Sequence, residues 1–325
     1  MNIKIRPETV RDYNAISSLT YTSFINWRPR DFVDEPILID NLRHNEQFDP
    51  DLSLVAELNG EIIGHVLLSP FTFYMKGKAK KGLWLAPLGV DPRFQRSGIG
   101  SQLMREAHRV ATEKGHDLCL LCGHDTYYPK FGYLNKLFAL SGAKITVEAP
   151  FITDQGITER AILKQDLAWV RSRWLEVHSN DALANYPGDS LAQWYSHSAS
   201  MKSSVFHQAD ELIGYVKYRA VKGLEIRDFL PAPGYGELLL ELLLNKVSSS
   251  EPVTASFALE ADVVASLLPN RNRYPIQAGK RVNPAFMLKV LNKTDEDLRA
   301  YCQAVLSNSE NAGVICFPSP MDIDD

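Results

Sequence analysis

Alternating hydrophobic and polar positions in the first part of the chain predict strands. Residues 2–6 alternate isoleucines with charged or polar side chains, and a helix is expected over 11–24, where three apolar residues fall roughly on one side. Three β-like runs come later, LSLVAEL, EIIGHVLLSPFTF and GLWLAPLGV. Asn59-Gly60 joins the first two runs and predicts a tight hairpin, because both residues tolerate a positive φ. The less regular stretch before these runs, residues 25–51, is expected to form a surface loop and a short helix, long enough to make one wall of a pocket.

A helix with one apolar face is expected after the third run. Its apolar positions are Ile99, Leu103, Ala107, Val110 and Ala111. Lys114-Gly115 is typical of a helix end. The run DLCLLCG follows, and the order of strand, helix and strand predicts a parallel pair of strands. The turn that opens the helix then lies at the carboxyl ends of these strands, where binding sites collect.

The same order of patterns returns in the second half of the chain. VAELNGEIIGHV at 55–66 resembles VFHQADELIGYV at 205–216, and GIGSQLM at 98–104 resembles GYGELLL at 234–240. A helix over 164–177 precedes the second copy. A chance match is the alternative, but the shared order of elements favours a duplication. The breaker residues in EAPFITDQG predict a boundary there, which gives domains at residues 1–152 and 160–325.

Composition agrees with two domains and excludes several classes of protein. The 325 residues are 45% hydrophobic, and a net charge of -4 argues against a bulk electrostatic hold on nucleic acid or an acidic membrane. The longest leucine-rich run is too short to span a bilayer. The N-terminal residues read as a strand and not as a signal peptide, so we expect a cytoplasmic protein without nucleic-acid or membrane partners.

The four cysteines predict neither a disulfide framework nor a metal site. Cys119 and Cys122 form a CxxC, but residues three apart in a strand point to opposite faces. Core thiols are therefore favoured over a redox or metal pair. We expect no bound metal.

The turn that opens the predicted helix, RFQRSGIGSQLM at 93–104, is rich in hydrogen-bond donors. The first amides of a helix are unpaired and carry partial positive charge, which suits a diphosphate. Gly98 and Gly100 remove the Cβ atoms that would keep phosphate oxygens from the backbone, and Arg93 and Arg96 could add positive charge at the rim. A lone Gly-x-Gly is often only a turn, but the strand before it and the helix and strand after it favour a phosphate site.

Three separated motifs together resemble a known family. Gln95-x-x-Gly98-x-Gly100, preceded by APLGVDPRF and followed by GHDTYYPKFGY, is similar to the acetyl-CoA-binding signature of the GNAT superfamily of N-acetyltransferases, over roughly residues 1–150. The resemblance implies an α/β (α+β) fold, a mixed twisted sheet flanked by helices, here as two GNAT-like domains in tandem with a degenerate second copy. It implies that the amides of 96–101 hold the CoA pyrophosphate, and that the backbone near Leu88 and Val90 binds the pantetheine arm like an added strand. The cofactor residues that it implies are Leu88, Gly89, Val90, Gln95, Arg96, Ser97, Gly98, Ile99, Gly100, Ser101 and Tyr128.

The resemblance also implies roles in moving an acetyl group from acetyl-CoA to a primary amine in a direct ternary complex. Tyr128 opens YPKFGY, a variant of the family's YxxxGF that ends in Tyr133, and is expected to protonate the departing thiolate. The Leu88 backbone N–H is the expected oxyanion donor. The alternative for Tyr128 is a core aromatic with its hydroxyl at the edge. Tyr127 is expected to pack or to line the substrate wall.

The general base is left open. GLWLAPLGV has no acidic residue where some members of the family carry a glutamate. The candidates are Glu57, His124 and Asp125, and His124 is favoured because imidazole exchanges protons near neutral pH. For each candidate taken singly, a role as a solvated or hydrogen-bonded structural residue is favoured over that of a base. A water chain without a dedicated base is equally compatible with the sequence, since positioning contributes much of such catalysis.

The second copy is not expected to bind CoA. DFLPAPGYGELLLELL keeps Gly234 and Gly236 but has Pro231 and Pro233, which offer no N–H, in the segment that corresponds to Gln95 and Arg96. This resembles tandem GNAT proteins such as the enhanced-intracellular-survival aminoglycoside acetyltransferases, in which one copy is catalytic and the other helps to shape the substrate pocket.

The remaining questions concern the acceptor and the tail. Residues 294–325 are expected to form a helix and a strand-like GVICF before an acidic end, and their place relative to the site is open. The acceptor, a small-molecule or exposed amine, and the oligomeric state are open too. The alternatives to the acetyltransferase are a noncatalytic acyl-CoA sensor or scaffold and a transferase for longer acyl groups.

Overall fold

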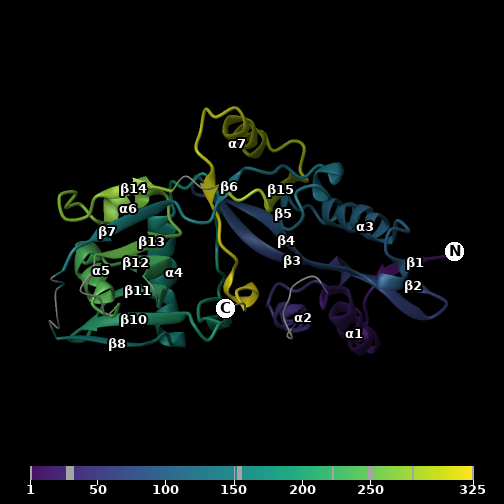
Figure 1. Ribbon diagram of the computed structural model, residues 1–325, viewed down its shortest axis with the longest axis horizontal. Helices are drawn as coiled ribbons and strands as arrows, with labels where there is room; N and C mark the ends of the chain where they lie inside the picture. The colour runs from purple at the N-terminus through teal and green to yellow at the C-terminus, as the bar shows by residue number, and fades with distance from the viewer. Residues whose placement is uncertain are drawn as a thin grey trace.

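The chain forms two large β-sheets that lie side by side, each covered by helices (Figure 1). The computed structural model describes residues 2–26, 33–149, 151, 156–221, 223–247, 252–279 and 282–323. Within these residues the first sheet has the order β1-β2-β3-β4-β5-β15, with β9 paired to β3. The second sheet has the order β14-β7-β13-β12-β11-β10-β8, and β6 and β16 form a small third sheet.

The first sheet is antiparallel except for one parallel pair, β4 and β5. Its strands are β1 (Lys4–Pro7), β2 (Ser53–Leu58), β3 (Glu61–Met75), β4 (Lys78–Val90), β5 (Leu118–Cys122), β9 (Ala184–Asn185) and β15 (Phe286–Val290). The helices around it are α1 (Tyr13–Phe24), α2 (Glu35–Arg43), α3 (Ile99–Glu113) and α7 (Glu296–Leu306). The predicted β2–β3 hairpin is confirmed, with φ values of 51° at Asn59 and 86° at Gly60.

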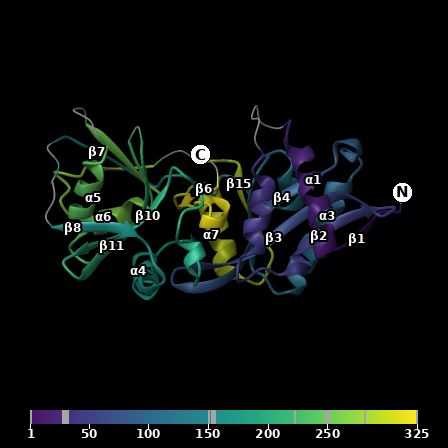
Figure 2. The ribbon, with the colours of Figure 1, turned by 90° about the horizontal axis from the view of Figure 1, so that it is seen from below.

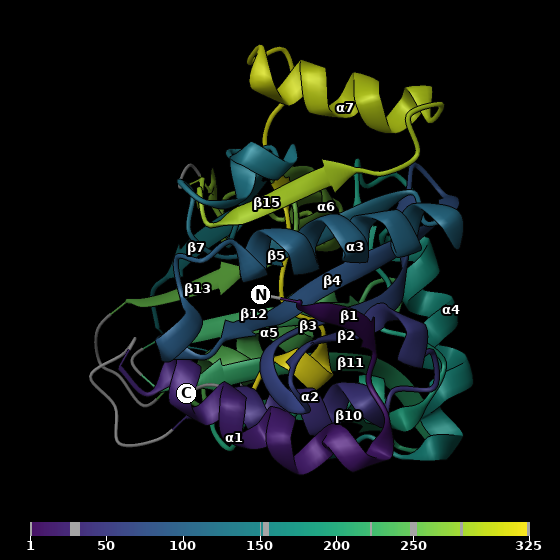
Figure 3. The ribbon, with the colours of Figure 1, turned by 90° about the vertical axis from the view of Figure 1, so that its right-hand side faces the viewer.

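The period-two pattern of the strands decides which helix covers which face. On β5, Leu118 and Leu120 point to the core under α1 and α2, whereas Leu121 points to the core under α3. These helices lie on opposite sides of the sheet (Figures 1 and 3). Cys119 is buried with Leu121 while Cys122 is exposed, so the CxxC residues do not form a pair.

The second sheet repeats the construction of the first. Its strands are β7 (Ala143–Val147), β8 (Ile157–Ala161), β10 (Lys202–Gln208), β11 (Glu211–Ala220), β12 (Leu224–Pro231), β13 (Val253–Phe257) and β14 (Ile276–Ala278). Its helices are α4 (Leu167–Val177), α5 (Gly236–Leu244) and α6 (Ala261–Leu267). The third sheet pairs β6 (Phe138–Ala139) with β16 (Gly313–Val314). The order β8-α4-β10-β11-β12-α5-β13 matches β1-α1-β2-β3-β4-α3-β5, and β12 and β13 are again the parallel pair.

The two halves exchange edge strands, and the second half also pairs the short β9 with β3. β7 leaves the first half and pairs antiparallel with β13, where Val147 lies opposite Val253. β15 comes from the second half and pairs antiparallel with β5, where Leu288 lies opposite Leu120. The division of the sheets therefore does not follow the expected ranges 1–152 and 160–325. An edge strand can be supplied by any part of the chain, and the local pattern of β7 or β15 does not say which sheet it completes.

Candidate active site

A gap opens in the first sheet where β4 parts from β5. The two strands are paired from Gly82 and Leu118 to Leu85 and Leu121, and beyond that point β4 stays paired only with β3. Pro87, which has no N–H, lies just past the last pair. The splayed strands implied by the resemblance are therefore present.

The edge of β4 presents backbone donors to this gap. The Asp91 N–H donates to the Ile63 carbonyl at 3.0 Å, and the residues that bond to a neighbouring antiparallel strand alternate. The N–H groups of Val90 and Leu88 therefore point away from β3 and into the gap. Ser23 and Gln95 each donate a side-chain hydrogen bond to the Val90 carbonyl at 3.1 Å, so two side chains fix this edge.

The turn before α3 is open and its amides are available. Arg96 and Gly98 have φ values of 62° and 87°, and residues 95–98 are exposed. In the described part of the chain the amides of residues 96–101 donate no hydrogen bond. A Cβ at Gly98 would meet no protein atom within 4 Å, so the space in front of these amides is free of the protein's own side chains. The turn therefore fits a diphosphate.

The basic side chains at this turn differ in their use. Arg93 pairs with Asp91 at 2.7 Å and also with Glu61, so its charge is neutralised by the protein itself. Arg96 is exposed at the rim. The Tyr127 hydroxyl would lie 3.0 Å from a Cβ at Gly100, and the Lys130 ammonium lies 4.1 Å from the centre of the Tyr127 ring. Tyr127 and Lys130 therefore belong to the surroundings of the turn, although from the sequence Tyr127 is expected only to pack or to line the substrate wall.

Tyr128 opens a 3₁₀ turn, Tyr128–Phe131, just past the end of β5. Its ring covers Gly123, where a Cβ would lie 2.4 Å from Cε2, and its centre is 5.1 Å from that of Tyr127. Burial, with Tyr127 beside it, raises the pKa of Tyr128 well above its ordinary value. The phenol is therefore protonated throughout the neutral range, as a proton donor must be.

One cleft of about 550 Å³ joins these features. It contains Leu88, Val90 and Tyr128 together with His124, which the sequence proposes as a base. The structure thus brings the expected acid, the oxyanion donor and one candidate base into the same space. The other lining residues come from β4, β5, α1, α2 and the C-terminal segment: Ser23, Phe24, Asp34, Glu35, Leu38, Leu85, Ala86, Pro87, Gly89, Gln95, Cys122, Gly123, Ala285, Phe317, Met321 and Ile323.

The other two candidate bases lie outside the cleft. Glu57 forms an ion pair with Arg6 at 2.8 Å on the β1–β2 side of the sheet, and Asp125 is exposed. Neither residue lines the cleft. The sequence could not exclude Glu57, because the pattern of β2 alone does not tell which face of the strand lies toward the gap.

The C-terminal residues 313–323, which we call the strap, run between the two halves and end beside α2 (Figures 1 and 2). Phe317 packs against Trp84 and Phe286, with ring centres 5.5 and 5.1 Å apart. Asn41 of α2 donates to the Pro320 carbonyl at 3.5 Å. The tail left open by the sequence therefore forms one wall of the cleft.

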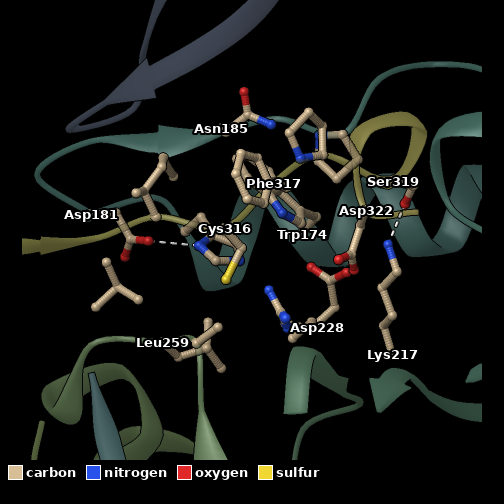
Figure 4. A pocket seen from close by; sticks show the side chains of 18 of the residues that line it. Trp174, Asp181, Asn185, Lys217, Asp228, Leu259, Cys316, Phe317, Ser319 and Asp322 are labelled. Atoms are coloured by element: carbon tan, nitrogen blue, oxygen red, sulfur yellow. Dashed lines mark hydrogen bonds and ion pairs between the residues drawn. The ribbon is translucent and has the colours of Figure 1, made fainter. Parts of the chain in front are cut away.

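The second sheet holds the strap through a small polar pocket of about 70 Å³ (Figure 4). Lys217 of β11 donates to the Ser319 hydroxyl, and Arg227 of β12 is hydrogen-bonded to Cys316. Burial holds the pKa of Lys217 below its ordinary value, although Asp228 and Asp322 act against that shift. Two basic side chains of the second sheet thus hold the segment that forms a wall of the cleft in the first.

The corresponding turn of the second copy is open at Gly234, where a Cβ would meet no atom within 4 Å, but it is closed at Gly236 by the chain itself. Gly234 keeps a positive φ of 85°, like Gly98. A Cβ at Gly236 would lie 2.0 Å from the Leu267 carbonyl oxygen, whereas the matching Gly100 faces the Tyr127 hydroxyl. The end of α6 therefore occupies the place where a phosphate would have to approach.

Among the described residues no three His, Cys, Asp or Glu side chains are grouped so that they could hold a metal ion. None of the helices in the described ranges combines the length and apolar character that a bilayer-spanning helix needs.

Comparison with known proteins agrees with this geometry. The model of the acetyltransferase (GNAT) family matches residues 15–133, which include the gap, the open turn and Tyr128. The chain belongs to the GNAT family. The uncharacterized N-acetyltransferase YjhQ of Escherichia coli K12 is 36% identical over 104 residues, which are 31% of this chain and 56% of YjhQ, so the chain spans little more than half of this relative.

Solved structures extend the likeness to both halves. A GCN5-related N-acetyltransferase from Kribbella flavida is 16% identical, with a TM-score of 0.62 over 90% of this chain and 72% of that chain. At this identity the likeness shows the fold, which is that of GNAT-like domains across both sheets. A GNAT family acetyltransferase from Brucella melitensis in complex with acetyl-CoA is 32% identical over 41% of this chain and 83% of that chain, with a TM-score of 0.37.

Proposed function

We propose that the protein transfers an acetyl group from acetyl-CoA to a primary amine, with both substrates bound at once. The observation that carries the proposal is the open row of amides at 96–101, next to a strand gap that leads to the protonated Tyr128. Membership of the GNAT family and the N-acetyltransferase name of the relative YjhQ support it.

Residues of the chain fit each part of the cofactor. The amides of 96–101 would hold the diphosphate, with Arg96, Tyr127 and Lys130 close by, and the Val90 N–H would receive the pantetheine arm, which leaves the Leu88 N–H for the thioester carbonyl. Acetyl-CoA supplies an acyl group activated as a thioester.

The cleft then provides a donor or acceptor for each charge that develops. The Leu88 N–H donates to the carbonyl oxygen as the new C–N bond forms. Tyr128 gives its proton to the sulfur as the C–S bond breaks. His124, which lines the same cleft, would take the proton that leaves the amine nitrogen, directly or through water.

The test is thiol release from acetyl-CoA with a panel of amines. We expect Tyr128→Phe to lower kcat by roughly 100-fold, because the thiolate then leaves without a proton donor. Calorimetry should show CoA binding close to that of the wild type. Since the pKa of Tyr128 is raised, the wild-type rate should show no alkaline decline from this residue up to about pH 10.

The matched control is Tyr21→Phe, at an exposed tyrosine of α1 that should leave the rate unchanged. A wild-type rate for Tyr128→Phe would remove its role as the acid. Tight CoA binding without acetylation of any amine would favour the noncatalytic sensor, and a preference for propionyl- or succinyl-CoA would favour the longer-acyl alternative.

A further inference from the structure

One side of the cleft is formed by apolar side chains from two segments that are distant in the sequence. Leu38 comes from α2, and Phe317, Met321 and Ile323 come from the strap. Met321 is buried, and Leu38 and Ile323 are half-buried. An apolar surface turned toward a ligand cavity contributes affinity in proportion to the apolar area that the ligand covers.

This wall is a fixed part of the structure. The strap is held by Phe317 against Trp84 and by the hydrogen bond from Lys217 to Ser319. Its last turn touches α2 through Asn41 and Pro320. A ligand in the cleft therefore meets a preformed apolar surface and need not order a loose tail, which favours binding.

A carboxylate lines the same cleft as these apolar side chains. Asp34 precedes α2, is 9% exposed and lines the cleft, and its side chain does not cap its own helix. Glu35, the first residue of α2, lines the cleft beside it. A largely buried carboxylate stabilises a cation next to it, and primary amines arrive as ammonium ions.

From these observations we infer that the acceptor is a small primary amine carried on an apolar alkyl or aryl group. The apolar body lies between Leu38 and the strap, and the nitrogen is first drawn by Asp34. The inference rests on the proposed acetyltransferase function. Amines with hydroxyl groups or further charges along the carbon chain are poor acceptors, because those groups would face Leu38, Met321 and Ile323 and not Asp34, and would lack hydrogen-bond partners there.

The size of the cleft agrees with a small acceptor. Cavities for small ligands span roughly 300–1,000 Å³. The cleft of about 550 Å³ must take the thioester end of the cofactor as well as the acceptor. A lysine on a folded protein is therefore not the expected acceptor, and a lysine peptide is included in the test for comparison.

The experiment compares amines in matched series with the full chain and acetyl-CoA. One series is propylamine, butylamine, pentylamine and hexylamine, with 2-phenylethylamine. The other is ethanolamine, spermidine, an aminoglycoside and a lysine peptide. We expect kcat/KM to rise up to about 4-fold with each methylene until the apolar wall is covered, and the hydrophilic amines to fall at least roughly 10-fold below hexylamine.

Two substitutions test the wall and one tests the carboxylate. Ile323→Gln and Leu38→Gln should flatten the dependence on chain length. Asp34→Asn should raise the KM for hexylamine by roughly 10-fold and leave CoA affinity unchanged. Leu306→Gln, at a residue of α7 that is 45% exposed and outside the cleft, is the matched control and should keep the wild-type dependence.

The outcomes separate this inference from the function beneath it. A higher kcat/KM for spermidine, the aminoglycoside or the lysine peptide, with thiol release intact, overturns the acceptor class and leaves the acetyltransferase standing. If no amine of either series gives thiol release although CoA binds by calorimetry, both the acceptor class and the acetyltransferase function are overturned. If a glutamine variant does not fold, as judged by its CoA binding, the wild-type series alone decides.

Discussion

At the scale of single residues, the site depends on two glycines, because a Cβ atom at either position would disturb it. Gly98 adopts a φ of 87°, in the left-handed region that favours glycine, and its α-carbon faces open space. Gly123 is required for a different reason, because a Cβ there would collide with the Tyr128 ring. Gly98 therefore leaves space for the ligand, and Gly123 leaves space for the ring of Tyr128.

Gly98→Glu should abolish the CoA site without unfolding the protein. The new side chain would bring bulk and negative charge to the place of the diphosphate. We expect CoA affinity to fall by roughly 100-fold or more, equivalent to about 2.7 kcal/mol, in calorimetric titration. The left-handed backbone should cost about 1–3 kcal/mol of stability in urea unfolding.

Gly115→Glu is the matched control for that experiment. Gly115 follows the end of α3 and has a φ of 76°, and a Cβ built there would also meet no atom within 4 Å. It should show a similar loss of stability with unchanged CoA affinity. Equal affinity in the two variants would count against the phosphate turn.

At the scale of elements, the two copies share a device that fixes the entry into the first helix. Asp12 accepts hydrogen bonds from both Nη atoms of Arg6 at 2.7 and 2.9 Å, and Asp166 does the same with Arg160 at 2.7 and 2.8 Å. Each carboxylate also accepts from the backbone N–H three residues earlier. The equal spacing of Arg and Asp in IRPETVRD and ERAILKQD was a signal of duplication beyond the hairpin and Gly-x-Gly matches.

These carboxylates should make stability depend on acid. The hydrogen bond from Arg6 lowers the pKa of Asp12 below its ordinary 3.8. Burial alone would raise the pKa of Asp166, but the hydrogen bonds from Arg160 and Leu163 outweigh it. A depressed pKa means that the contribution is complete above about pH 4 and is lost as the pH falls further.

We therefore expect Asp12→Asn and Asp166→Asn each to lower the free energy of unfolding at pH 7 by about 1–3 kcal/mol. Each should also reduce the loss of stability below pH 4, measured by urea unfolding from pH 7 down to pH 2. Asp40→Asn is the control, because Asp40 is paired with Arg43 but exposed, and should change stability by less than about 1 kcal/mol. Variants with the wild-type acid slope would exclude the proposed linkage.

At the scale of the whole molecule, the exchanged strands and the strap make the halves depend on each other. β15 covers the edge of β5, and α7 adds Leu298, Tyr301 and Val305 to the core under α1. The strap is hydrogen-bonded to Lys217 of the second sheet and lines the cleft of the first. A copy whose own turn is blocked at Gly236 by Leu267 thus contributes to a site in the other copy.

A fragment that ends at residue 152 should therefore not fold alone. It keeps the open turn and Tyr128 but exposes the β5 edge and part of the core, which favours aggregation. We expect it to lack a cooperative thermal transition and CoA binding, and to recover both when produced together with residues 153–325. A full chain cleaved at an engineered protease site within 152–155 is the control and should elute as one assembled species. A soluble, CoA-binding fragment would show that the exchanged strand is dispensable.

Features that depend on neighbouring residues could be predicted from the sequence. Asn59-Gly60 set the hairpin, the apolar spacing from Ile99 set α3, and the Gly98 turn with YPKFGY indicated the family, because backbone freedom and side-chain period act over a few positions. Other features became known only from the folded chain: Glu57 pairs with Arg6, Leu267 blocks Gly236, β7 and β15 join the sheet of the other half, and the strap forms a wall of the cleft. Each of these depends on which distant surfaces meet when apolar faces are buried, and that is a property of the assembled chain.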